Sequence, residues 1–378
     1  MFVPMNNLLN NDRIRQEFQE ALLQWFEVNK RTLPWRERKD WYGVFLSEFL
    51  LQQTQVTQAL PYFQKLIRTY PTVEALASAS EDELLRHWAG LGYYSRARNL
   101  RKAAKVIVER FSGRFPQNYA EALSLPGIGP YTASAILSIA FNQPLPVVDG
   151  NVIRVITRVF NIGEDVRQTK TQKQIREIAA QLLPNQTPGR FNEAMMELGA
   201  LTCQPTSPLC EQCPLQKWCL ADRQGSVLKI PFKSPPAPKK HFYQFVLLFV
   251  ATDGRLLTVK RPRNGLLASM WEFPTLETTP EELNTPEPIR EFLSRYQTAA
   301  PIVLPQMKHI YSHISLRYRP LLLSVNLPFE FHSRFYVQQK WLQLESISSL
   351  ALHNAHKKIL TNNKFAEWWQ RKGFENKK

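Results

Sequence analysis

The stretch LPGIGPYTASAILSIAFNQPLPVVDGN, residues 125–151, is the part of the chain that decides the fold of its first half. It opens with a glycine turn, continues as an apolar run of helical length from Tyr131 to Phe141, and closes on Asp149 in an otherwise uncharged segment. Gly127 and Gly129 allow the main chain to approach an anion, and N–H groups near a helix N-terminus bind phosphate. Turns of this kind also commonly precede helices that bind no ligand. The rest of the chain must therefore decide between a phosphate-binding turn and an ordinary turn.

Length and composition predict a two-domain protein that binds a polyanion. A chain of 378 residues, 44% of them hydrophobic, is longer than a domain with a single hydrophobic core usually is. No uninterrupted apolar run reaches the ~18–20 residues of a membrane span, and the N-terminus lacks the order of a secretory signal, so we expect a cytoplasmic protein. The net charge is +16, divided as +6 over residues 1–230 and +10 over 231–378. Two basic halves without an anchor or lipidation signal favour nucleic acid over an anionic membrane.

All four cysteines fall within one short segment with the spacing C-x6-C-x2-C-x5-C: Cys203, Cys210, Cys213 and Cys219. A reducing compartment argues against two disulfides, and unrelated core cysteines would not cluster in this way. The cluster therefore predicts a metal site. Zinc quartets usually contain two short C-x2–4-C pairs, whereas this one contains a single short pair, which favours an iron–sulfur centre.

Helical periodicity runs through the first 225 residues, without strand-like alternation. The helix expected over about 42–53 carries Glu48 among apolar residues, either on an exposed polar side or partly buried with the raised pKa of a general acid. The loop 89–96, AGLGYYSR, presents Leu91, Tyr93 and Tyr94. Such side chains usually pack inward, but in a nucleic-acid-binding protein they wedge between or stack on bases.

The composition changes abruptly near residue 226. Residues 226–241 are rich in proline and lysine and predict a semi-rigid linker. Beyond it, two β-rich runs joined by an Asp-Gly turn predict a hairpin over 242–261. Further β-rich runs at 316–325 and 334–341 precede a helical tail at 354–371. We therefore expect an all-α domain over 1–225, a linker over 226–241 and an α+β domain over 242–378.

Several motifs together resemble the A/G-specific adenine DNA glycosylases, a family of the helix–hairpin–helix superfamily that holds an iron–sulfur cluster. They are LPWR, SEFLLQQTQV, GLGYYSRARNL, LPGIGPYTA, VVDGN and the cysteine cluster, in that order. The resemblance covers most of residues 20–220, and the C-terminal part is similar to that family's Nudix-like domain. It implies a bacterial, monomeric, monofunctional enzyme, acting on nucleoid DNA, that flips out adenine mispaired with 8-oxoguanine or guanine in double-stranded DNA and leaves an abasic site.

The resemblance also implies roles for individual residues. Glu48 would protonate the flipped adenine, Asp149 would be the catalytic aspartate, and Tyr131 and Asn151 would support Asp149 and the sugar. The other matched positions are the adenine pocket, Trp35, Arg36 and Glu193; the DNA-binding set, Gln53, Thr54, Leu91, Gly92, Tyr93, Gly127 and Gly129; the 8-oxoguanine loop, Tyr311, Ser312 and His313; and the four cysteines as [4Fe–4S] ligands.

The chemistry of base removal agrees with these assignments. A departing purine leaves an oxocarbenium-like sugar, so one carboxyl should protonate the base while another stays ionised beside the cation. The base reacts only outside the stack, which requires extrusion and a group that fills the gap. Relatives that also cut the strand have a lysine nucleophile where this chain has Tyr131. Tyr131 therefore argues against a pyrimidine-damage glycosylase/lyase, and the two carboxyls argue against a non-catalytic mismatch sensor.

Two positions depart from the family pattern. The loop between Cys203 and Cys210 reads QPTSPL and lacks the basic residues often found there, which puts a phosphate contact from that loop in doubt. Tyr311 stands where the family commonly has phenylalanine. The Nudix-like part also lacks the glutamate-rich metal-binding helix, so we expect no nucleoside diphosphate hydrolysis there.

Overall fold

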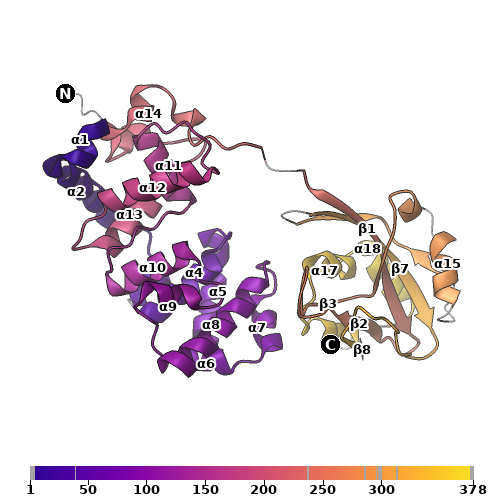
Figure 1. The fold of residues 1–378 in the computed structure, drawn as a ribbon. Coiled ribbons are helices and arrows are strands. Elements are labelled where there is room, and N and C mark those ends of the chain that lie inside the picture. Colours follow the sequence, from indigo (N-terminus) through magenta and orange to yellow (C-terminus); the bar gives the residue numbers. More distant parts are fainter. Residues whose placement is uncertain are drawn as a thin grey trace. The chain divides into compact units, whose positions relative to one another are not determined.

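The computed structural model describes residues 5–38, 40–235, 238–284, 287–294, 296, 300–311 and 314–374. They form two compact units, one of Met1–Ala79 with Asn99–Pro235 and the other of Ser80–Arg98 with Pro236–Lys378 (Figure 1). The boundary near residue 235 falls inside the proline- and lysine-rich segment. No helix of the described chain combines the length and the apolarity that a membrane crossing requires.

The described part of the first unit is helical, as the periodicity predicts. The α-helices up to residue 223 are α1 (Met5–Asn10), α2 (Asp12–Asn29), α3 (Pro34–Arg38), α4 (Trp41–Leu51), α5 (Val56–Thr69), α6 (Val73–Ser78), α7 (Glu81–Trp88), α8 (Ser95–Phe111), α9 (Tyr119–Ser124), α10 (Pro130–Phe141), α11 (Gly150–Val159), α12 (Thr169–Leu182), α13 (Pro188–Leu201) and α14 (Leu220–Arg223). Of these, α7 and the first turn of α8 belong to the second unit. Three 3-10 turns follow α13: η1 (Cys210–Gln212), η2 (Gln216–Trp218) and η3 (Val227–Lys229). The helix expected over 42–53 ends at Leu51, because Gln53 has a positive φ of 59° that a helix does not accommodate.

The 125–151 stretch forms α10 and leads into α11. Gly127 turns the chain with φ +79°, and Pro130 occupies the first helical position, where its missing N–H is no loss. All residues from Thr132 to Ser138 are buried, so α10 is a central helix that packs against α4 and α13. Asn142 ends α10 in the left-handed conformation, and Asp149 then caps α11.

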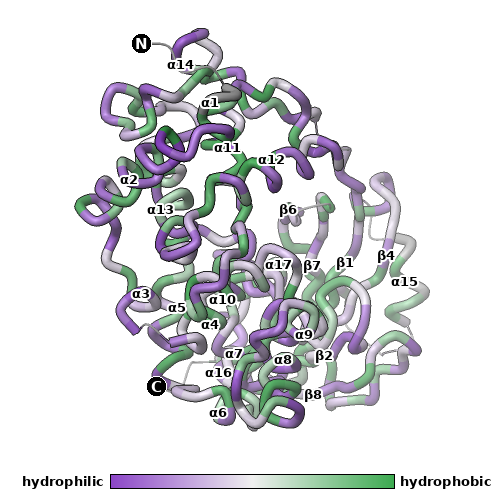
Figure 2. Tube along the Cα trace, turned by 60° about the vertical axis from the view of Figure 1, so that its left-hand side comes forward, coloured by the Kyte–Doolittle hydropathy of each residue, from purple (hydrophilic) through white to green (hydrophobic). Residues whose placement is uncertain are grey.

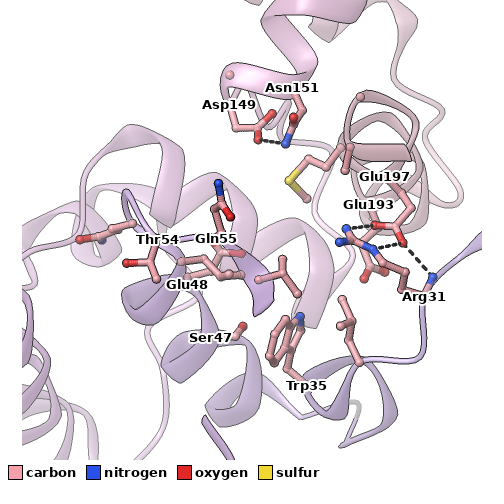
Figure 3. A pocket seen from close by; sticks show the side chains of 18 of the residues that line it. Arg31, Trp35, Ser47, Glu48, Thr54, Gln55, Asp149, Asn151, Glu193 and Glu197 are labelled. Atoms are coloured by element: carbon pink, nitrogen blue, oxygen red, sulfur yellow. Dashed lines mark hydrogen bonds and ion pairs between the residues drawn. The ribbon is translucent and has the colours of Figure 1, made fainter. Parts of the chain in front are cut away.

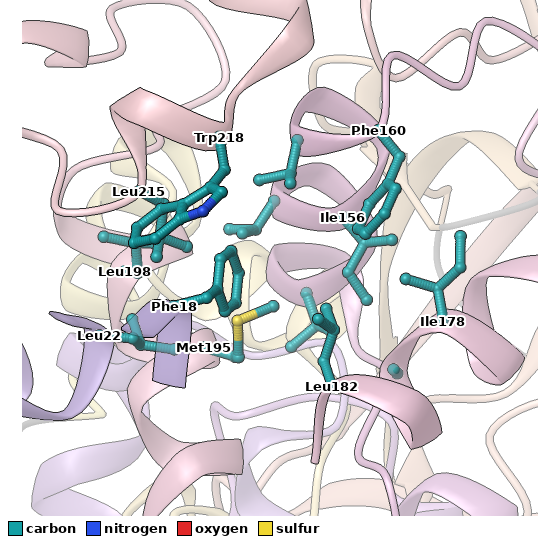
Figure 4. Packing of buried hydrophobic residues seen from close by; sticks show 14 of the residues in the cluster. Phe18, Leu22, Ile156, Phe160, Ile178, Leu182, Met195, Leu198, Leu215 and Trp218 are labelled. Carbon is teal, nitrogen blue, oxygen red and sulfur yellow. The ribbon is translucent and has the colours of Figure 1, made fainter. Parts of the chain in front are cut away.

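A hydrophobic core joins α2, α11, α12 and α13 to the segment that carries the cysteines (Figure 4). Phe18 on α2 packs edge-on against Trp218, with ring centroids 5.3 Å apart. Met195 and Leu198 on α13 and Ile156 on α11 belong to the same cluster. The cysteine segment is therefore held by the core of the helical unit rather than hanging from its surface.

Glycines set the distance between α13 and its two neighbours. A Cβ on Gly189 would lie 2.4 Å from the Ser138 carbonyl oxygen of α10, and one on Gly199 would lie 2.5 Å from the Asn151 Cβ of α11. Such distances are far below van der Waals contact. Both helices therefore approach α13 at places where a methyl group does not fit.

The C-terminal part is α+β, as predicted, with one eight-stranded sheet. Its strands are β1 (Lys240–Ala251), β2 (Leu256–Lys260), β3 (Trp271–Glu272), β4 (Thr275–Glu277), β5 (Ile302–Val303), β6 (Met307–Ile310), β7 (Ile314–Val325) and β8 (Gln338–Leu342). β1 and β2 form the expected antiparallel hairpin, and β1 pairs in parallel with β7 along its whole length. Strand order along the main path is β3-β2-β1-β7-β5.

Apolar residues cover both faces of this sheet. The run Val246–Ala251 of β1 alternates between two core clusters and is hydrophobic throughout (Figure 2). One cluster contains residues of α16 (Leu344–Ile347), α17 (Asn354–Leu360) and α18 (Asn363–Arg371), and the other contains residues of η4 (Glu282–Asn284) and α15 (Glu287–Ser294). A strand buried on both faces reads as a continuous apolar run, which explains the sequence of β1.

Candidate active site

A cavity of about 980 Å³ opens in the helical unit, between α3, α4, α10, α11 and α13. The carboxyl side chains that line it include Glu48 on α4, Asp149 at the N-cap of α11 and Glu193 on α13 (Figure 3). Nine of the residues singled out from the sequence line it: Trp35, Arg36, Glu48, Gln53, Thr54, Tyr131, Asp149, Asn151 and Glu193. The fold thus gathers positions that are up to 158 residues apart in the chain into one site.

Glu48 is the buried carboxyl of this cavity. It sits on α4, whose residues from Tyr42 to Leu50 are all buried, and its Oε2 has no hydrogen-bond partner among the described residues. Burial raises the pKa of Glu48 from 4.5 to about 7, although a hydrogen bond with Tyr131 opposes the shift. Of the two alternatives drawn from the sequence, the exposed polar side and the buried acid, the structure has the buried acid.

Asp149 is held by hydrogen bonds at the start of α11. Its Oδ1 accepts from the backbone N–H of Val152 at 2.7 Å, and its Oδ2 accepts from Asn151 Nδ2 at 2.9 Å. Burial raises the pKa of Asp149 above 3.8, while these hydrogen bonds and the nearby Arg154 guanidinium act in the opposite direction. Glu48 lacks comparable donors to its Oε2, so the two carboxyls experience different environments.

Arg154 links Asn151 to the cysteine segment. Its Nη2 donates to Asn151 Oδ1 at 2.8 Å and to the carbonyl of Gly199 at 2.7 Å, while its Nε donates to the carbonyl of Cys203 at 2.7 Å. Arg154 was not among the residues predicted from the sequence. Its position three residues after Asn151, one helical turn away, was the available signal.

Two arginines and two glutamates form a chain of ion pairs along another wall of the cavity. Arg31 pairs with Glu197 at 2.7 Å, Arg36 pairs with the same Glu197 at 3.1 Å, and Arg36 also pairs with Glu193 at 2.9 Å. Trp35 packs edge-on against Phe63 beside them. Arg31 and Glu197 were not predicted. The signal for Glu197 was its i,i+4 spacing from Glu193 on a largely apolar helix.

The predicted DNA-binding residues fall into separate groups. Gln53, which is exposed, and Thr54 lie at the cavity in the turn after α4. Gly127 and Gly129 lie in the turn before α10 and do not line the cavity. Around Gly127 a Cβ would meet Asn99 Cβ at 2.6 Å, whereas the space around Gly129 is open.

Leu91, Gly92 and Tyr93 belong to the second compact unit. Tyr93 has φ 49° and is 44% exposed, and the Arg96 guanidinium carbon lies 5.5 Å from the centre of its ring. Leu91, which was also expected to insert into a duplex, is 5% exposed in this conformation, and its insertion stays a prediction. Gly92 has φ +78° and its carbonyl accepts from Trp88 Nε1.

Of the expected 8-oxoguanine loop, only Tyr311 lies within the described residues. Ser312 and His313 lie outside them. Tyr311 is half-buried beside the core of the sheet domain, and its backbone N–H donates to the carbonyl of Ile314 at 2.8 Å. This bond joins the residue after β6 to the first residue of β7.

The four cysteines line one small cavity together with Arg158 and Asp222. Arg158 Nη1 lies 3.3 Å from Cys203 Sγ, and its guanidinium also donates to the main-chain carbonyls of Gln204 and Pro205 within the cysteine segment and of Val227 and Ile230 after it. Ligands of one tetrahedral zinc ion have sulfurs about 3.8 Å apart. In the described part of the chain, no three of these cysteines have sulfur atoms that all lie within 4.8 Å of one another. No three of these sulfurs are therefore as close together as the ligands of one zinc ion.

Comparison with known proteins agrees with both parts of the chain. Residues 46–184 match the family of HhH-GPD superfamily base excision DNA repair proteins, and residues 245–362 match the NUDIX domain. The chain is 36% identical over 400 residues to the adenine DNA glycosylase of Rattus norvegicus, covering 90% of this chain and 77% of the relative. It is 32% identical over 350 residues to the adenine DNA glycosylase of Buchnera aphidicola, covering 92% and 97%.

A solved structure, that of a thermostable thymine-DNA glycosylase, has a similar fold. It matches with a TM-score of 0.51 and 28% sequence identity, and covers 56% of this chain and 97% of its own.

Proposed function

The chain belongs to the adenine DNA glycosylase family, and from this membership we propose that it hydrolyses the N-glycosidic bond of adenine mispaired with 8-oxoguanine or guanine in double-stranded DNA. The observation that supports the proposal most directly is the pairing of Glu48 and Asp149 in one cavity, with different environments for the two carboxyls. One carboxyl is suited to give a proton near neutral pH, and the other to remain ionised.

The proposed reaction uses both groups in sequence. The flipped adenine enters the cavity, and Glu48 donates its proton to a ring nitrogen as the bond to the sugar breaks and its electron pair leaves with the base. The Asp149 carboxylate stabilises the positive charge that develops on the sugar, and Asn151 and Tyr131 hold the groups in place. Water then adds to the sugar and releases a proton, which leaves an abasic site.

Tyr131 supports hydrolysis without strand cleavage. It occupies the position of the lysine with which lyase relatives form a Schiff base, and a phenol does not form one. Burial raises the pKa of the Tyr131 hydroxyl well above its usual range, so it stays protonated. Borohydride treatment of the enzyme with its substrate DNA should therefore yield no covalent adduct.

The cysteines of residues 203–219 are proposed to hold a [4Fe–4S] cluster, which would tie this segment together without taking part in hydrolysis. Arg158 and Arg154 then orient the segment against α11. Purified protein should be brown and contain iron rather than zinc. A colourless, zinc-containing and fully active preparation would contradict this assignment.

The wider architecture is proposed on the same basis. Domains would span 1–225 and 242–378 with a linker between them, and the protein would act as a monomer in the bacterial cytoplasm on nucleoid DNA. The residues that would contact the duplex are Gln53, Thr54, Leu91, Gly92, Tyr93 and the 127–129 turn. The loop of Tyr311, Ser312 and His313 would read 8-oxoguanine.

The deciding experiment measures adenine release under single-turnover conditions from duplexes with A opposite 8-oxoguanine, G, T or C. Alkali treatment of a parallel sample distinguishes base removal from strand cleavage. We expect release opposite 8-oxoguanine and G, with breaks only after alkali. Asp149→Asn should bind these duplexes and release adenine at least roughly 100-fold more slowly. A wild-type protein that binds mispairs without releasing base would be a mismatch sensor instead.

A further inference from the structure

Glu197 on α13 is a buried carboxylate of the cavity that has no role in the reaction as described above. Its side chain is 1% exposed, and it accepts three hydrogen bonds from Arg31: from the backbone N–H at 2.8 Å, from Nε at 2.9 Å and from Nη2 at 2.7 Å. A carboxylate this deeply buried is stable only when it is paired. Glu197 therefore fixes both the main chain and the guanidinium of Arg31.

The same carboxylate also holds Arg36. The two terminal nitrogens of Arg36 lie 3.2 and 3.1 Å from the oxygens of Glu197, while its Nε donates to Glu193 Oε1 at 2.9 Å. Burial alone would raise the pKa of Glu197, but the hydrogen bonds from Arg31 and Arg36 outweigh it and lower the pKa to about 2. Glu197 is thus a permanent anion shared by two cations.

Adenine differs from unsubstituted purine by its exocyclic amine, which donates hydrogen bonds and therefore needs an acceptor. Glu193 lines the cavity and has carboxylate oxygens to offer, and Arg36 is its ion-pair partner. We propose that Glu197 is a positioning residue for recognition of this amine: it anchors Arg36, which in turn holds the Glu193 carboxylate where the amine of the flipped base is bound. The inference rests on the proposed function, since it assigns a second task within the same site.

All five hydrogen bonds that the described residues give to Glu197 come from Arg31 and Arg36. Loss of the carboxylate would therefore displace Arg31 and Arg36, and Glu193 through Arg36. It would affect Glu48 and Asp149 much less. A role in general stability alone would slow the release of every base to the same degree. The ratio of release rates for adenine and purine separates these two possibilities.

The test is single-turnover base release by Glu197→Gln from two duplexes, with adenine or unsubstituted purine opposite 8-oxoguanine. Loss of one charge-assisted contact to the amine predicts a roughly tenfold slower release of adenine, with purine changed by less than about twofold. Glu177→Gln on α12 is the matched control, because Glu177 is exposed and makes only a 3.9 Å ion pair with Lys173. Its two rates should equal those of the wild type.

Thermal unfolding shows whether Glu197→Gln is folded at the assay temperature, because removing one member of a buried ion network is destabilising. Glu197→Asp keeps the charge on a shorter side chain and serves as the second variant. Its adenine-to-purine ratio should fall roughly threefold, between the values for the wild type and for glutamine. An unchanged ratio in the folded variants overturns the role of Glu197. Absence of adenine release by the wild type overturns the proposed function instead.

Discussion

Glu48 and Asp149 are both carboxyls, yet their neighbours differ in the number of hydrogen bonds that they donate. Asp149 receives two donors at 2.7 and 2.9 Å, whereas Glu48 Oε2 receives none from the described residues. Hydrogen bonds favour the ionised form and burial favours the neutral form. These local contacts therefore favour a protonated Glu48 that can act as an acid and an ionised Asp149.

The raised pKa of Glu48 predicts a pH dependence for the chemical step. Because burial places this pKa at about 7, the protonated fraction falls about tenfold per pH unit above that value. The single-turnover rate of adenine release should decline with the same slope. At the acid end the rate should fall as Asp149 protonates, at a pH above 3.8. A rate independent of pH between 6 and 9 would remove Glu48 as the proton donor.

The same shift predicts that Glu48→Gln alters stability in a pH-dependent way. The pKa of Glu48 in the folded state, about 7, exceeds the ordinary 4.5, so ionisation of Glu48 destabilises the folded wild type. This loss of unfolding free energy is absent below pH 4.5, grows between pH 4.5 and about 7, and is constant above that. The free energy of unfolding of Glu48→Gln minus that of the wild type should rise over this window, by on the order of 3 kcal/mol. Urea titrations at pH 4.5, 6 and 8 measure it, and a flat difference would contradict the burial effect.

Residues close to a sequence motif could be predicted, and partners that only the fold brings together could not. Glu48, Asp149 and Trp35 stand in motifs that resemble a known family. Arg31 and Glu197 lie 166 residues apart, and only the packing of α13 near the start of α3 makes them a pair. The burial of Leu91 was equally invisible, because a glycine-rich loop fits both an inward and an outward side chain.

At the scale of elements, Asp149 is both a proposed catalytic group and the N-cap of α11. Asparagine also accepts a hydrogen bond at an N-cap, whereas alanine does not. Both Asp149→Asn and Asp149→Ala should lose adenine release. Only the alanine variant should lose about 1 kcal/mol of unfolding free energy through the cap. Denaturant titrations of the two proteins distinguish the roles, and equal stability would show that the cap contributes little.

The turn before α10 offers a matched pair of glycines. Gly127 has φ +79° and no room for a Cβ, so Gly127→Ala should lower the unfolding free energy by at least about 1 kcal/mol. Gly129 has an ordinary φ of −98° and open surroundings, so Gly129→Ala should fold normally. If its main chain contacts a phosphate, the added methyl group should weaken duplex binding. Thermal unfolding and DNA-binding titrations together check both expectations.

The longer helices between residues 12 and 201 and the β1–β2 hairpin could be predicted because their periodicity is strong, whereas the short helices α3, α6 and α9 were not predicted. Helix ends were less predictable. The left-handed conformation of Gln53, which ends α4, is unusual for glutamine and left no mark on the sequence. The parallel pairing of β1 with β7 joins strands 74 residues apart, and no local pattern specifies such a partner.

At the scale of the whole molecule, the segment between the two parts is less free than its composition suggests. Arg158 Nε donates to the carbonyls of Val227 and Ile230, and the backbone N–H of Val166 donates to that of Phe232. Ser234 N–H donates to Asp165 Oδ2 at 3.3 Å. Residues 227–234 therefore run along the helical unit. They make up half of the predicted linker, residues 226–241, so that this half is anchored.

Limited trypsin digestion should reflect this anchoring. Lys239 lies between the anchored residues and the start of β1, whereas Lys229 lies within the anchored residues. Proteases cut where the backbone is free to adapt, so the first cleavage should follow Lys239 and leave Lys229 intact. Mass spectrometry of the early fragments identifies the site. Early cleavage after Lys229 would show that the hydrogen bonds of Arg158 do not hold this segment in solution.

The glycine contacts of α13 have a consequence for how the protein tolerates mutation. Gly189 and Gly199 leave no space for a methyl group against α10 and α11, and these helices carry Tyr131 and Asn151. A replacement at either glycine would push the wall with Glu193 away from the wall with Asp149, although neither glycine takes part in the chemistry. Loss of activity can thus arise from substitutions at residues that have no reactive side chain, because these glycines set the width of the cavity.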